Sequence, residues 1–207
     1  MRTKLLVRNA VCMGTVKPGL FEVDDFAASL ELGPVEEQVV LPDLSFTEWE
    51  HIRLQILPDR LQLGFKESAR SDLLRRAIEL FVSRKNDLLP RASLGFNAGM
   101  QITLEEGEKD PSSDLIDASR LASALGATAA RGGVTLVFDD KLSRWWIELS
   151  PDPDEPGVWI YDFNRQLEEL PDSGDAFEGI LDWFSRVDEE LLAQFETIVG
   201  SSEESRR

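Results

Sequence analysis

Two neighbouring runs in the first half of the chain alternate apolar and polar residues, and this pattern constrains the fold most. Residues 51–56 are His-Ile-Arg-Leu-Gln-Ile and residues 60–65 are Arg-Leu-Gln-Leu-Gly-Phe, with Leu57-Pro58-Asp59 between them. Side chains alternate between the two faces of a strand, and a Pro-Asp turn favours an antiparallel return. The runs therefore predict a hairpin with one apolar and one polar face. The apolar face would carry Ile52, Leu54, Ile56, Leu61, Leu63 and Phe65, and the polar face His51, Arg53, Gln55, Arg60 and Gln62.

Other strands are predicted where runs rich in β-formers end at turn-forming residues. Lys4–Met13 and Ser93–Leu104 are two such runs. Val35–Phe46 contains Pro42 and is expected to be an edge strand or an extended connection, because proline cannot donate a hydrogen bond to a neighbouring strand. Leu20–Leu32 fits either a strand or a short helix.

The second half contains three more strand-like runs with short turn-forming segments between them. Asp139-Asp140 separates the first two, and the proline-rich segment 151–157 separates the last two. Short connections of this kind join antiparallel neighbours, so an antiparallel meander is expected. Its strands would be Val134–Phe138, Arg144–Leu149 and Val158–Phe163.

Three segments place apolar residues at helical spacing, namely 69–86, 114–125 and 175–199. The last is the longest, and its stripe consists of Phe177, Ile180, Leu181, Phe184, Val187, Leu191, Phe195 and Ile198. The predicted fold class is therefore α+β, with mainly antiparallel strands in one or two sheets covered by three helices, including a long C-terminal helix.

The chain of 207 residues is long enough to bury a substantial core in one domain. We expect a single α+β domain over residues 1–200, either undivided or built from two similar halves, 1–106 and 107–200. Residues 201–207 have no apolar anchor and are predicted to form a disordered tail.

Net charge is the most unusual property of the composition, at −17. Residues 51–100 have a local basic excess, with nine basic and five acidic side chains. A strongly negative field disfavours direct binding to nucleic acid and favours a basic protein partner. The alternative interpretation is that the acidity only aids solubility and implies no partner.

The cellular compartment is inferred from membrane, signal and cysteine features. No apolar run reaches the roughly 18 residues of a membrane span, and the first 13 residues lack a signal-cleavage site. The single cysteine, Cys12, cannot form an internal disulfide and is expected to be an inert buried thiol. These features predict a cytoplasmic protein that does not bind membranes.

Catalytic and metal-binding patterns are weak in this sequence. With one histidine, His51, and one cysteine, one chain cannot supply four nitrogen or sulfur ligands to zinc. The acidic segment 152–155 lacks the spacing of a calcium loop and is interpreted as a solvated turn. Asp139-Asp140-Lys141 resembles the acid and lysine of restriction-type nucleases but falls where a hairpin turn is expected. We therefore predict no catalytic residues, no bound metal and no cofactor.

Aromatic residues gather in the predicted meander, where Trp145, Trp146, Trp159 and Tyr161 lie close together in sequence. Alternation places Trp145 and Trp146 on opposite faces of their strand, and Trp146 shares its face with Arg144 and Glu148. Because tryptophan is enriched among interface hot spots, an outward Trp146 is a candidate partner anchor. The alternative is that a second layer or the N-terminal segment covers this tryptophan. The predicted partner-binding residues are Trp146, Trp159, Arg144 and Glu148.

Three short segments carry a resemblance to a known family. They are Leu94-Gly95-Phe96-Asn97, Tyr161-Asp162-Phe163-Asn164 and Phe195-Glu196-Thr197-Ile198. Together with the order of elements, they resemble a sporadically distributed family of uncharacterised bacterial α+β proteins, although Gly95 departs from the arginine of its strand pattern. The resemblance implies an association with mobile or antiviral-defence genes, and it implies no activity.

Three functions are compatible with these features. The leading hypothesis is a non-catalytic acidic interaction protein, such as an adaptor, an immunity factor or an accessory subunit of a bacterial complex. The second is a DNA-mimicking inhibitor, which requires the acidic residues of 101–207 to form one phosphate-like surface. The third is a metal-dependent hydrolase or nuclease built from scattered carboxylates.

Overall fold

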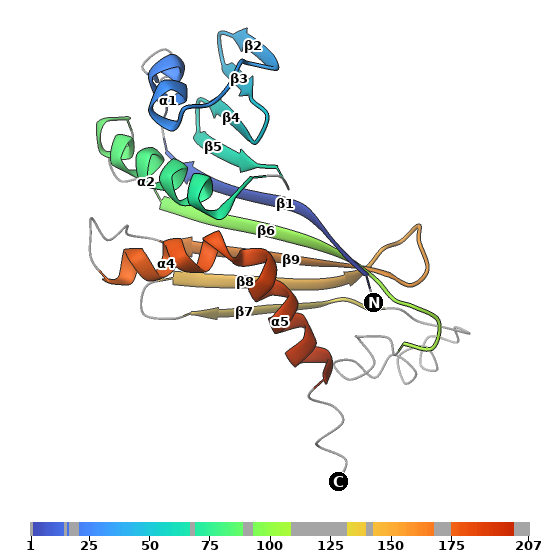
Figure 1. Ribbon diagram of the computed structural model, residues 1–207. Helices are drawn as coiled ribbons and strands as arrows, with labels where there is room; N and C mark the ends of the chain where they lie inside the picture. The colour runs from blue at the N-terminus through green and yellow to red at the C-terminus, as the bar shows by residue number, and fades with distance from the viewer. Residues whose placement is uncertain are drawn as a thin grey trace.

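The computed structural model describes residues 2–14, 16, 21–66, 69–88, 93–108, 132–139, 143–167 and 175–200. Within these ranges the chain forms a nine-stranded sheet and four short helices (Figure 1). The strands are β1 Arg2–Met13, β2 Glu37–Leu41, β3 Leu44–Glu48, β4 Ile52–Leu57, β5 Arg60–Phe65, β6 Ser93–Thr103, β7 Val134–Asp139, β8 Ser143–Pro151 and β9 Val158–Leu167. The helices are α1 Val23–Leu30, α2 Ser71–Leu88, α4 Asp175–Ser185 and α5 Val187–Gly200.

The sheet order is β2-β3-β4-β5-β1-β6-β9-β8-β7, and every neighbouring pair is antiparallel. The predicted hairpin is confirmed, with a register that runs from Ile52 opposite Phe65 to Leu57 opposite Arg60. The predicted meander is present as β7, β8 and β9. The long strands β1 and β6 pair at the centre and join the strands of the first half to those of the second.

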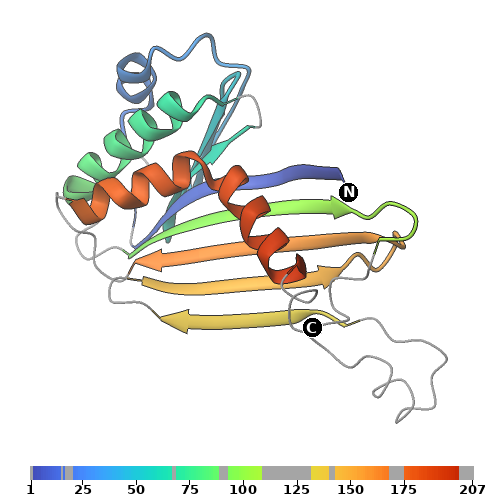
Figure 2. The ribbon, with the colours of Figure 1, turned by 60° about the horizontal axis from the view of Figure 1, so that its bottom comes forward.

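The helices cover one face of this sheet (Figure 2). The covered face contains the apolar side of the hairpin and the inward residues of the central strands, including Ala10, Cys12, Phe96 and Ala98. Aromatic rings connect the two halves of the chain in this layer. The Phe184 ring centroid on α4 lies 4.8 Å from that of Phe96 on β6 and 6.0 Å from that of Phe65 on β5.

The predicted fold class is wrong in its balance of helix and sheet. The described residues form predominantly one large sheet with four short helices, and the long C-terminal helix predicted over 175–199 is two helices that meet at Arg186. Arg186 N donates to Trp183 O at 3.1 Å in a tight turn, and Ser71 Oγ donates to Ser185 O at 3.0 Å. The Ser185 carbonyl thus accepts a hydrogen bond from the first residue of α2, and the chain changes direction at this position.

Other predicted elements have mixed outcomes. The segment 20–32 contains the short helix α1, and 35–46 contains β2, an edge strand, and most of β3. The predicted helix over 114–125 and the predicted tail 201–207 lie outside the described residues. Both predicted halves, 1–106 and 107–200, contribute strands to the same sheet. No described helix has the length and apolar character required to span a membrane.

Candidate functional site

The face of the sheet opposite the helices is the candidate site, and we call it the open face. Its residues alternate with the buried ones, so they are identified by strand register. Asn9 on β1 pairs with Asn97 on β6, which pairs with Asn164 on β9. The complete row in register across the nine strands is Glu37, Glu48, Arg53, Gly64, Asn9, Asn97, Asn164, Trp146 and Val137.

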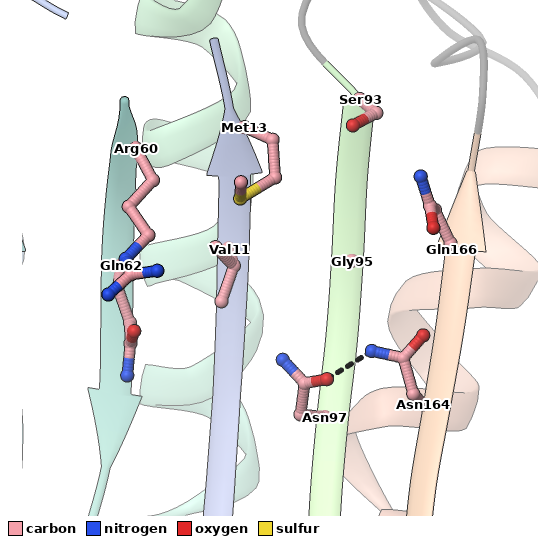
Figure 3. Close-up of a pocket in the computed structure, with 9 residues that line it drawn as sticks. All are labelled: Val11, Met13, Arg60, Gln62, Ser93, Gly95, Asn97, Asn164 and Gln166. Atoms are coloured by element: carbon pink, nitrogen blue, oxygen red, sulfur yellow. Dashed lines mark hydrogen bonds between the residues drawn. The ribbon is translucent and has the colours of Figure 1, made fainter. Parts of the chain in front are cut away.

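Three asparagines form a hydrogen-bonded ladder at the centre of the open face. Asn97 Nδ2 donates to Asn9 Oδ1 at 2.7 Å. Asn164 Nδ2 donates to Asn97 Oδ1, as the dashed line in Figure 3 shows. Asn9 and Asn164 each use one group within the ladder, and Asn97 uses both its oxygen and its nitrogen, yet each amide retains further hydrogen-bonding capacity. The ladder therefore holds a fixed polar centre that can still bond to a ligand or partner.

Two hollows flank this ladder and share Asn97 and Asn164. The first, which we call the Arg60 hollow, has a volume of about 330 Å³ and is lined by Val11, Met13, Arg60, Gln62, Ser93, Gly95, Asn97, Asn164 and Gln166. The second, the Trp146 hollow, has a volume of about 250 Å³ and is lined by Val7, Asn97, Ala98, Thr135, Trp146, Glu148, Asp162, Phe163 and Asn164. The centre of the open face is thus hollowed on both sides of the ladder.

Three of the four predicted partner-binding residues lie together on the open face of β8. Trp146 is half-buried, whereas Arg144 and Glu148 are exposed. Arg144 Nε donates to Asp139 Oδ1 at 2.7 Å, and its Cζ lies 5.9 Å from the centroid of the Trp146 ring. This distance allows a cation–π contact, which helps to hold the indole in place.

Trp159, the fourth predicted residue, lies elsewhere. It is 2% exposed and belongs to the core under the helices, because it pairs with Ile102 on the covered face. A side chain this buried has almost no surface with which to contact a partner. Trp145 also faces the helices, with its ring centroid 5.2 Å from that of Phe163 and 4.2 Å from Arg165 Cζ.

Two carboxylates lie opposite each other beside Trp146. Glu148 on β8 pairs with Asp162 on β9, and within the described part of the chain neither is in an ion pair. Partial burial and the negative charge of Glu148 both raise the pKa of Asp162. A Cβ atom at Gly99 would lie 2.5 Å from Asp162 Oδ1, so glycine leaves the space that this carboxylate occupies. Among the described residues, the Trp146 hollow therefore combines an aromatic ring with two carboxylates that no ion pair neutralises.

This pair predicts a pH-dependent gain in stability for Asp162→Asn. Because folding raises the pKa of Asp162, the protonated carboxyl group stabilises the folded state relative to the ionised one. This contribution is complete below the ordinary pKa of about 3.8 and is lost as pH rises through the raised pKa of the folded state. At about pH 7 the variant should be more stable than wild type by about 0.2–1 kcal/mol, the range for like charges directly opposite on neighbouring strands.

Urea denaturation of both proteins at about pH 7 and about pH 4 measures this gain, which should shrink in acid. Asp154→Asn is the matched control, because it removes a carboxylate from an exposed turn. A gain for Asp162→Asn that is the same at both pH values would contradict the like-charge interpretation.

The catalytic alternatives find little support in the described residues. No group of three or more His, Cys, Asp or Glu side chains there is arranged to hold a metal ion. Asp139 lies at the end of β7 in its ion pair with Arg144, while Asp140 and Lys141 fall outside the described residues. Asp152 Oδ1 accepts from Asp154 N at 2.8 Å and from Glu155 N at 3.0 Å, which stabilises a turn.

The DNA-mimic alternative requires one continuous acidic surface. Among the described acids of 101–207, Glu148 and Asp162 lie on the open face, whereas Glu178 and Asp182 lie on α4 and pair with Arg75 of α2. The described acids are therefore divided between opposite sides of the sheet, and four of them, Asp139, Glu178, Asp182 and Glu190, lie in ion pairs with arginine.

Sequence reasoning missed the asparagine ladder and the Arg60 hollow. Asn97 occurs within a strand-like run and Asn164 directly follows another, although asparagine is disfavoured in strands, and that mismatch was the available signal. Gly95, which departs from the pattern of the resembled family, lies among the residues that line the Arg60 hollow.

Comparison with known proteins assigns no family. No protein-family model matches this chain, and no curated protein shows a significant match to its sequence.

Proposed function

We propose that this chain is a non-catalytic interaction protein that binds a partner protein through the Trp146 end of its open face. The observation that carries this proposal is the position of Trp146, a half-buried aromatic ring beside a hollow on the face opposite the helices. Aromatic anchors next to a pocket and surrounded by polar groups are typical of interface hot spots.

The charge of this end supports a basic partner. Glu148 and Asp162 lie side by side without an ion pair among the described residues, and the whole chain has a net charge of −17. A lysine or arginine of the partner placed in the Trp146 hollow would relieve the repulsion between the carboxylates and face the indole ring. An adaptor, an immunity factor or an accessory subunit of a cytoplasmic bacterial complex fits this chemistry. A link to defence systems rests on the family resemblance alone.

Charge-directed binding predicts a specific response to salt and to Glu148→Gln. The partner is captured from a bacterial lysate at low salt, purified and titrated by calorimetry. Affinity should fall as salt rises from about 0.1 M to about 1 M, where the screening length shortens from about 10 Å to about 3 Å. Glu148→Gln should weaken binding about two- to fivefold, the range for an exposed ion pair.

Glu189→Gln is the matched control, because it removes the same charge from an exposed position on α5, on the helix-covered side. It should leave the affinity unchanged. An affinity that does not depend on salt, or equal losses for the Glu148 and Glu189 variants, would contradict binding at this end of the open face.

A further inference from the structure

Arg60 presents a positive group in the other hollow of the open face. Its Nε is buried, and no hydrogen-bond acceptor contacts this atom in the described part of the chain. None of the nine residues that line the Arg60 hollow is acidic, although the chain has 39 acidic and 22 basic side chains. A buried donor without an acceptor is costly, and an anion that pairs with the guanidinium in the hollow would offset this cost.

The remaining lining of the Arg60 hollow is rich in neutral polar groups. Figure 3 shows Asn97, Asn164 and Gln166 around a bare stretch of β6 at Gly95, and Gln62 on β5 beyond Val11 of β1. Primary amides both donate and accept hydrogen bonds, as hydroxyl groups do, and Ser93 adds one hydroxyl. This lining therefore matches a ligand with several hydroxyl groups.

We propose that the Arg60 hollow binds a small, hydroxyl-rich carboxylic acid of the sugar-acid class. The carboxylate would bond to the Arg60 guanidinium, and the hydroxyls would bond to the surrounding amides. Arg60 supplies one positive charge, and the chain as a whole has a net charge of −17. A singly charged carboxylate is therefore favoured over a phosphate dianion, because the dianion would be repelled more strongly. The volume of about 330 Å³ lies at the small end of the range for ligand pockets.

Gly95 offers a way to close this hollow without disturbing the core. A Cβ atom built there would lie 3.9 Å from Asn164 Nδ2 and 3.9 Å from Val11 O, which are ordinary contacts. Its strand neighbours Leu94 and Phe96 point to the covered face. Gly95→Leu should therefore place its side chain in the hollow while the sheet keeps its register.

The test is a nitrogen-15 NMR titration of the full chain with glucuronate. The Arg60 Nε–H signal and the side-chain amide signals of Asn97, Asn164 and Gln166 should shift and saturate by about 10 mM, which requires a Kd of millimolar or below. Glucose tests the need for the carboxylate, and inorganic phosphate tests whether any anion suffices. Both should bind at least about tenfold more weakly than glucuronate. Glucose lacks the charged hydrogen bond to Arg60, and phosphate lacks the hydroxyl groups that would bond to the amides.

Two variants and one control complete the test. Arg60→Gln and Gly95→Leu should each weaken glucuronate binding about tenfold or more. Arg53→Gln removes an arginine from the open face outside the hollow and should leave the affinity unchanged. Thermal melts establish that each variant is folded. The absence of saturable shifts in wild type, equal binding of glucose or phosphate, or retention of binding by both hollow variants would overturn the proposal. Protein-partner binding at Trp146 is measured separately and does not depend on this result.

Discussion

Replacing Phe184 with alanine should lower the free energy of unfolding by about 3–5 kcal/mol. The side chain is 0% exposed, and its ring contacts Phe65 and Phe96 from the first half of the chain and Trp183 from its own helix. Removing the ring leaves a cavity where α4 meets the centre of the sheet, so both the transfer free energy and the packing are lost. Equilibrium denaturation in urea measures the difference.

Gly179→Ala on the same helix is the matched control. A Cβ atom there has no neighbour within 4 Å, and alanine is favoured over glycine inside a helix by about 0.5–1 kcal/mol. This control should stabilise the protein slightly, whereas Phe184→Ala destabilises it strongly. A loss below about 1 kcal/mol for Phe184→Ala would show that α4 does not anchor the core.

Replacing Trp146 with alanine should weaken partner binding by about 2 kcal/mol or more, which is roughly a 30-fold rise in Kd. Trp146 lies on the open face and is half-buried among polar groups, so its removal should change folding stability little. The measurement pairs a calorimetric titration of the captured partner with a thermal melt of the same variant.

Trp145→Ala provides the contrast, because the neighbouring indole faces the helices and contacts Phe163, Trp183 and Arg165. That variant should lose folding stability, and once folded it should retain most of its affinity. Equal melting losses for the two variants, or an unchanged affinity for Trp146→Ala, would remove Trp146 from the binding surface.

Local patterns predicted the strands well and the helices less well. The alternation in 51–65 and the turn at Pro58 were sufficient to predict the β4–β5 hairpin and its two faces. The break at Arg186 was not predictable, because the apolar stripe continues from Phe184 to Val187 and Leu191 without a change of period. The break is associated with a tertiary bond from Ser71, which sequence periodicity does not contain.

Only those features of the candidate site that depend on a single strand could be predicted from the sequence. Polarity on either side of Trp146 placed that residue on the open face, whereas Trp159 was assigned by its proximity in sequence and lies in the core. The asparagine ladder joins residues 88 and 67 positions apart, so it depends on which strands pair at the centre of the sheet. The Arg60 hollow depends on the same pairings.

Fluorine NMR of 5-fluorotryptophan protein tests most directly whether partners bind the open face. The chain has five tryptophans, which single Trp→Phe variants assign. Trp49 and Trp159 are buried, Trp145 and Trp183 contact each other on the helix side, and Trp146 lies on the open face. On addition of the captured partner, the Trp146 signal should shift or broaden most while those of Trp49 and Trp159 stay in place. A shift of Trp183 or Trp49 with Trp146 unchanged would place the partner on the helix side and contradict the proposal.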